Sequence, residues 1–151
     1  MIPLIVLITV FAVIFIADKF ILKNRLGLSY CGRIALAFML IVTGIAHFTN
    51  TPVMIEMMPE MVPFKTEVVY ITGILELVAA GFLISKNYSI ITSYALIIFF
   101  IAIIPANIVG SMKRLALGGM ENGISYLYFR IPLQIFFIAW TYYFGIKRNT
   151  S

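Results

Sequence analysis

Five long apolar stretches occupy most of this chain, and each is close to the ~20 residues that a helix needs to cross a bilayer. Of all residues, 62% are hydrophobic and 11% are charged, which is not the composition of a water-soluble domain. The connections between the stretches are short, so a separate soluble domain is not expected. We predict an all-α polytopic membrane helical bundle, a single membrane domain over residues 1–151, with spans at Ile2–Leu22, Ile34–Asn50, Glu67–Ser85, Ile90–Ser111 and Ile124–Gly145.

The first stretch has a competing interpretation as a cleaved signal peptide. It lacks a basic segment at its start, and Phe15 is a poor residue three positions before a cut after Ala17. We favour a retained helix, although the sequence leaves cleavage open.

The basic residues predict the orientation of the spans. The expected connections place seven of them on one side and three on the other, so by the positive-inside rule the N-terminus is outside and the C-terminus is cytoplasmic. The protein is therefore expected in the cell membrane as a multi-pass protein. The seven are Lys19, Lys23, Arg25, Arg33, Lys86, Lys147 and Arg148, and the three are Lys65, Lys113 and Arg114.

The net charge of +5 does not indicate nucleic-acid binding, because the basic residues stand singly or in pairs at span ends. The single cysteine, Cys31, excludes an internal disulfide and a dithiol mechanism within one chain. The bilayer itself is the expected partner, and a homo-oligomer is compatible with the sequence.

Polar side chains inside the last four stretches are the candidate ligand-binding residues. Such groups are costly in a bilayer unless they face the bundle interior and find partners. With a rise of ~1.5 Å per residue, all of them fall in the outer half of the membrane or near its midplane. They are His47, Glu76, Asn107, Arg130 and Gln134.

Glu76 and Arg130 form the strongest expected pair, since two opposite charges are far cheaper together than apart. The pair has a structural interpretation as an ion pair and a functional one as part of a site. His47 is either a proton carrier or a hydrogen-bonded structural residue. One His and one Glu are too few ligands for a metal site, so no metal is expected.

Pro105 predicts a kink or break just before Asn107, whose amide either satisfies freed backbone or faces a ligand. On the third stretch, Gly73, Ala80 and Gly81 indicate a close helix contact near Glu76.

Four methionines in the outer connection Thr51–Phe64 follow helical spacing, interrupted by prolines. We interpret this segment as a short interfacial helix or broken lid over the bundle mouth. Thioethers can bind Cu(I), but methionine is also an adaptable apolar filler, which we favour. The lid residues are Met54, Met57, Met58 and Met61.

Several short motifs, in this order and spacing, resemble the DoxX-like family of small membrane proteins. The resemblance covers about residues 30–145 and implies a four-helix core plus one additional N-terminal helix. The motifs are Gly44-Ile-Ala-His-Phe48, Met58-Pro59 to Val62-Pro63, Tyr70-Ile-Thr-Gly-Ile-Leu-Glu-Leu77, Pro105-Ala-Asn-Ile108 and Arg130-Ile-Pro-Leu-Gln134 through Trp140.

That resemblance implies a redox-accessory or quinone-interacting subunit, with quinone as the candidate cofactor and none bound covalently. The chain has no haem-ligand pair, dinucleotide fingerprint or iron–sulfur cysteine set, so electrons would come from a redox partner protein. An accessory subunit is therefore favoured over a self-sufficient enzyme. The alternative is a binding, transport or assembly protein for a small lipophilic molecule, without catalytic activity.

Overall fold

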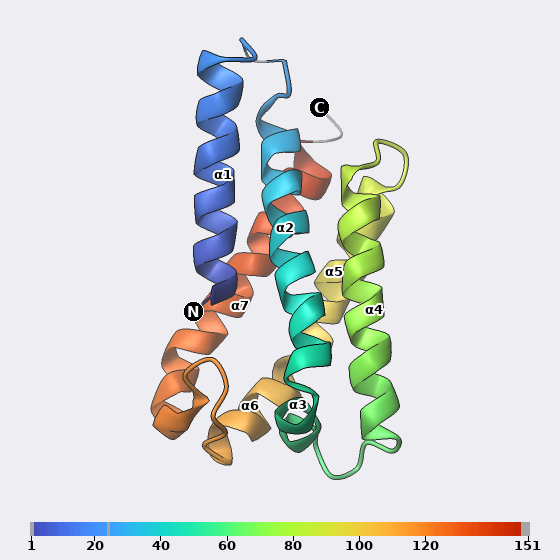
Figure 1. Ribbon diagram of the computed structural model, residues 1–151, viewed down its shortest axis with the longest axis vertical. Coiled ribbons are helices and arrows are strands. Elements are labelled where there is room, and N and C mark those ends of the chain that lie inside the picture. Colours follow the sequence, from blue (N-terminus) through green and yellow to red (C-terminus); the bar gives the residue numbers. More distant parts are fainter. Residues whose placement is uncertain (1, 24, 149–151) are drawn as a thin grey trace.

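The computed structural model describes residues 2–23 and 25–148, and this part of the chain is helical without any strand (Figure 1). Long helices run up and down the bundle, and shorter segments close one end. The segments are α1 (Ile2–Phe20), α2 (Leu28–Thr49), α3 (Thr51–Met57), α4 (Lys65–Ile84), α5 (Ser89–Ala102), α6 (Ile104–Met112), the 3₁₀ segment η1 (Met120–Tyr126), α7 (Leu127–Thr141) and the π-helical turn η2 (Tyr142–Lys147).

The prediction of an all-α fold with apolar helices is confirmed. Within the described residues, four helices are long and apolar enough to cross a membrane: α1, α2, α4 and the broken helix Ser89–Met112. The fifth expected span corresponds to α7, a regular α-helix of 15 residues that continues into η2. Because α7 alone is shorter than a membrane-spanning helix requires, the fifth span stays a prediction.

The second helix begins at Leu28, between one and two turns before the predicted start at Ile34. The predicted span leaves Arg33 just outside the helix, among the basic residues of the preceding connection. Instead Arg33 is buried within α2, and its guanidinium lies 5.3 Å from the centre of the Tyr30 ring. An aromatic face can accommodate a guanidinium, so the helix continues through the charge.

The predicted break at Pro105 is confirmed. α5 ends at Ala102 and α6 begins at Ile104, with Pro105 in the first turn of the new helix. Proline suits that position because its missing N–H would have no intrahelical partner there. The break redirects α6 across the end of the bundle, beside α3 (Figure 1).

Small residues allow α2 and α4 to cross closely, as predicted for Gly73. A Cβ on Gly73 would lie 2.7 Å from the Cβ of His47 and 3.2 Å from the carbonyl oxygen of Gly44. Ala80 is also buried, but Gly81 is exposed with nothing within 4 Å, so its expected place in this contact was wrong.

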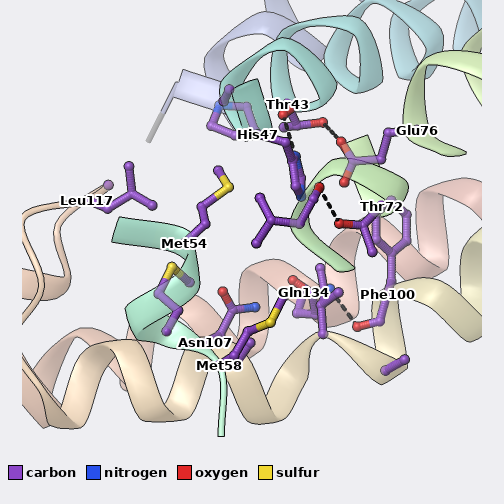
Figure 2. Close-up of a pocket in the computed structure, with 18 of the residues that line it drawn as sticks. Thr43, His47, Met54, Met58, Thr72, Glu76, Phe100, Asn107, Leu117 and Gln134 are labelled. Atoms are coloured by element: carbon purple, nitrogen blue, oxygen red, sulfur yellow. Dashed lines mark hydrogen bonds between the residues drawn. The ribbon is translucent and has the colours of Figure 1, made fainter. Parts of the chain in front are cut away.

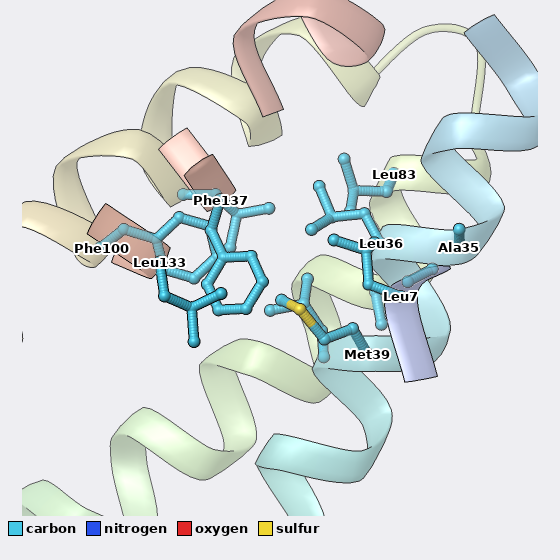
Figure 3. Packing of buried hydrophobic residues seen from close by; sticks show 12 residues of the cluster. Leu7, Ala35, Leu36, Met39, Leu83, Phe100, Leu133 and Phe137 are labelled. Atoms are coloured by element: carbon cyan, nitrogen blue, oxygen red, sulfur yellow. The ribbon is translucent and has the colours of Figure 1, made fainter. Parts of the chain in front are cut away.

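The apolar core lies where α2, α4, α5 and α7 meet, and α1 adds Leu7 to it from the edge (Figure 3). Phe11 of α1 also packs edge-on against Trp140, with ring centroids 5.0 Å apart. Most other side chains of α1 are partly or fully exposed, so α1 lies at the edge of this core.

Candidate ligand-binding cavity

A cavity of about 700 Å³ is lined in part by residues of α3 and α6. These two helices lie together at one end of the bundle (Figure 1). The walls of the cavity come from α2, α3, α4, the break between α5 and α6, η1, α7 and the first residues of α1. This volume is within the ~300–1,000 Å³ range of small-molecule sites. Most of the lining side chains are aliphatic, aromatic or methionine, so the cavity suits a largely apolar molecule.

All five candidate residues line this one cavity, although they come from α2, α4, α6 and α7. Glu76, Asn107 and Gln134 are each no more than 5% exposed. His47 and Arg130 are half-buried. The structure thus brings these side chains to a common space, and their role in ligand binding stays a prediction.

Thr43 connects Glu76 to His47 on one side of the cavity (Figure 2). Its hydroxyl donates to Oε2 of Glu76, and its carbonyl oxygen lies 2.9 Å from Nδ1 of His47. A carbonyl only accepts, so Nδ1 carries the hydrogen and, in the neutral ring, Nε2 is an acceptor.

Arg130 and Asn107 form a second polar group. Nη2 of Arg130 donates to Oδ1 of Asn107 over 3.1 Å. Nε of Arg130 and Nδ2 of Asn107 are buried and have no hydrogen-bond partner in the described structure. Two donors on residues that line the cavity are therefore unsatisfied by protein.

The expected ion pair between Glu76 and Arg130 is not formed. Within the described residues the carboxylate is hydrogen-bonded to Thr43 and the guanidinium to Asn107, and neither is within ion-pair distance of the other. The hydroxyl of Thr43 and the amide of Asn107 take the place of the opposite charges that were expected beside Glu76 and Arg130.

Gln134, and not Asn107, satisfies backbone at the helix break. Its Nε2 donates to the carbonyl oxygen of Phe100 over 2.7 Å, in the last turn of α5 (Figure 2). The side chain of Asn107 instead accepts a hydrogen bond from Arg130. Gln134 therefore has the structural role that was considered for Asn107, which is to bond a backbone group freed at the break.

The methionine segment is a short helix followed by an irregular loop, and all four methionines line the cavity. They do not share one helix face, however. α3 ends at Met57, and Met58 is extended (φ −72°, ψ 141°) because the following Pro59 disfavours helical backbone. Met57 is 9% exposed, whereas Met61 is 87% exposed.

Contacts with α6 hold α3 in place. The absent side chain of Gly110 leaves room for Met57 and Met120, since a Cβ there would lie 2.9 Å from Cγ of Met57 and 2.7 Å from Sδ of Met120. Nζ of Lys113 also donates to the carbonyl oxygen of Glu56 over 3.1 Å. Packing and a hydrogen bond from α6 therefore both hold α3 in place.

The candidate ligand-binding residues did not include several that line the cavity. Thr43 lies four residues before His47, a spacing that predicts a shared helix face, and both residues line the cavity. Tyr126 precedes α7 in a segment without helical periodicity, and Ile2 and Pro3 reach the cavity only through the packing of α1. No sequence pattern indicated these three.

Comparisons with known proteins identify a family whose function is unknown. No curated protein and no solved structure matches the chain. Residues 36–145, which contain all five polar candidates and the whole lid, match the model of a family described as a domain of unknown function (DUF8561). The chain therefore belongs to this family of unknown function.

Proposed function

We propose that this chain is an integral membrane protein that binds a lipophilic molecule by its polar head group. The observation that carries this proposal is the cavity itself, a mostly apolar space of about 700 Å³ into which five polar side chains converge. An apolar pocket with a few convergent polar groups is the usual form of a small-molecule site. The unsatisfied donors of Arg130 and Asn107 support a head group that accepts hydrogen bonds.

The resemblance to the DoxX-like family extends this proposal to redox chemistry. In that reading, α2, α4, α5–α6 and α7 form the family's four-helix core, α1 is an addition, and the lipophilic molecule is a quinone. The chain then serves as an accessory subunit, and a partner oxidoreductase supplies the electrons. The peripheral packing of α1 supports this division of the bundle.

The proposed location is the cell membrane, with the cavity in its outer half and the C-terminus in the cytoplasm. Residues 21–23, 25–27 and 85–88 lie at the end of the bundle opposite α3 and α6 (Figure 1). That end holds most of the basic residues, which favour the cytoplasmic side.

Co-purification tests the proposal directly. We would purify the full chain, extract its lipids and identify enriched lipophilic molecules and bound proteins by mass spectrometry. We expect about one enriched molecule per chain, with less in Asn107→Leu. Thr141→Val is the matched control, because Thr141 is fully buried in α7, bonded to the carbonyl oxygen of Phe137 and away from the cavity.

The outcomes separate the candidate functions. A quinone together with an oxidoreductase would support the redox-accessory role. Another lipophilic molecule without such a partner would support binding, transport or assembly. If wild-type protein enriches nothing over bulk lipid, the binding proposal is wrong.

A further inference from the structure

The polar groups of the cavity divide into two walls of opposite hydrogen-bonding character. Glu76 and His47 on α4 and α2 present acceptors, whereas Arg130 and Asn107 on α7 and α6 present donors. Figure 2 shows His47 and Glu76 on one side of the drawn space and Asn107 on the other. No ion pair joins the two walls within the described residues, so each keeps unused hydrogen-bonding capacity.

The acceptor wall has two free positions. Oε2 of Glu76 receives the hydroxyl of Thr43, but Oε1 has no protein donor among the described residues. Nδ1 of His47 is occupied by the carbonyl of Thr43, which leaves Nε2 for another partner. Both groups are therefore oriented by Thr43 and open to a donor from a ligand.

The donor wall is organised in the same way. The bond from Arg130 to Asn107 uses one guanidinium nitrogen and the amide oxygen. It leaves Nε of Arg130 and Nδ2 of Asn107 without partners, although both atoms are buried. Unmade hydrogen bonds in a buried site are costly, so a ligand that makes them gains affinity.

We propose that the ligand carries a hydrogen-bond donor and a hydrogen-bond acceptor on separate atoms of its head group and bridges the two walls. The donor meets Glu76 and His47, and the acceptor meets Arg130 and Asn107. This inference rests on the proposed binding function and narrows it to amphiphiles with a hydroxyl and a second oxygen. A quinone meets this requirement in its reduced quinol form, which has hydroxyl donors, and not in its oxidised form, which has acceptors alone. A head group with acceptors alone leaves the Glu76 wall unpaired, and one with donors alone leaves the Arg130 wall unpaired.

Three probes with twelve-carbon chains test the inference on the full chain in lipid nanodiscs. 1-Monolaurin has both hydroxyls and an ester carbonyl, methyl laurate has acceptors alone, and dodecylammonium has donors alone. The amount retained per protein after washing is measured by mass spectrometry over a range of probe concentrations. We expect monolaurin to bind at least about tenfold more tightly than either other probe, which corresponds to about 1.4 kcal/mol.

Two variants test which wall binds the donor of the head group and which binds the acceptor. Glu76→Leu should weaken monolaurin and dodecylammonium about tenfold and leave methyl laurate unchanged. Asn107→Leu should weaken monolaurin and methyl laurate and leave dodecylammonium unchanged. Thr141→Val should retain the wild-type order for all three probes.

The wild-type panel decides the inference even if a variant fails to fold. Equal binding of the three probes would overturn the two-wall inference and leave the binding function intact. Binding of none would overturn both. In the variants, an equal loss for every probe would show that neither wall distinguishes donors from acceptors, which also overturns the inference.

Discussion

Gln134 shows how one side chain accommodates a broken helix inside an apolar bundle. The last carbonyls of a helix have no intrahelical donor, and in a membrane no water replaces it. Gln134 is 3% exposed, and its amide donates to one such carbonyl, that of Phe100. The residue therefore acts through the backbone of α5, although it lines the cavity.

Gln134→Leu removes this donor and should lower the free energy of unfolding by about 1–3 kcal/mol, the usual cost of an unsatisfied buried group. Equilibrium unfolding in detergent measures the loss. Thr141→Val, also on α7, should lower the free energy of unfolding by less. The carbonyl oxygen of Phe137 loses the Thr141 hydroxyl but keeps its backbone N–H partner in the helix. Equal losses in the two variants would contradict this role of Gln134.

Double-mutant cycles can distinguish the observed pairs from the one expected from charge alone. The stability losses of Glu76→Gln and Arg130→Gln should add within about 0.3–0.5 kcal/mol, because the two side chains do not meet. Thr43→Val with Glu76→Gln should instead be coupled, by about 0.5–3 kcal/mol, through their hydrogen bond. Strong coupling between Glu76 and Arg130 would mean that they pair in the membrane.

At the scale of elements, α3 depends on a few well-placed contacts. The hydroxyl of Thr51 donates to the carbonyl oxygen of His47 over 2.7 Å and so ties the start of α3 to the end of α2. Met57 then packs against Gly110 and Met120. A seven-residue helix has little stability of its own, so these contacts hold it over the cavity.

The two ends of the lid should therefore respond differently to the same substitution. Met57→Asp places a carboxylate in a buried contact. It should weaken binding of monolaurin at least about tenfold and should also lower the free energy of unfolding. Met61→Asp should change stability by no more than about 0.5 kcal/mol, since Met61 is mostly exposed. Retention in nanodiscs and unfolding in detergent measure the two effects, and similar losses in both variants would exclude this account of the lid.

The helices were predictable because length and apolar content determine which segments can span a bilayer, and Pro105 marked the break between α5 and α6. A common location for the five polar residues was predictable for a similar reason, since each must avoid lipid. The partners were not predictable. Whether Arg130 meets Glu76 or Asn107 depends on helix rotation and depth within one turn, which periodicity does not specify.

For the whole molecule, the alternating passes of the chain separate two chemically different ends. Residues 21–23, 25–27 and 85–88 lie at the same end as the last residues of η2, and α3, α6 and η1 lie at the opposite end (Figure 1). Lys23, Arg25, Lys86, Lys147 and Arg148 belong to the first end. The cavity belongs to the second, so its side of the membrane follows from the orientation of the bundle.

Cysteine labelling of intact cells tests this orientation in a Cys31→Ala background, which removes the buried native thiol. Met61→Cys should react with an impermeant maleimide in intact cells, because Met61 is 87% exposed at the proposed outer end. Asn87→Cys, exposed at the opposite end, should react only after permeabilisation. Leu75→Cys on the exposed apolar side of α4 should stay unlabelled in both cases if that side faces lipid, although Leu75 is 54% exposed, because thiols in hydrocarbon do not ionise and react. Labelling of Asn87→Cys but not Met61→Cys in intact cells would invert the bundle and place the cavity in the cytoplasmic half. Labelling of Leu75→Cys in intact cells would show that α4 faces water, and the membrane assignment itself would then be wrong.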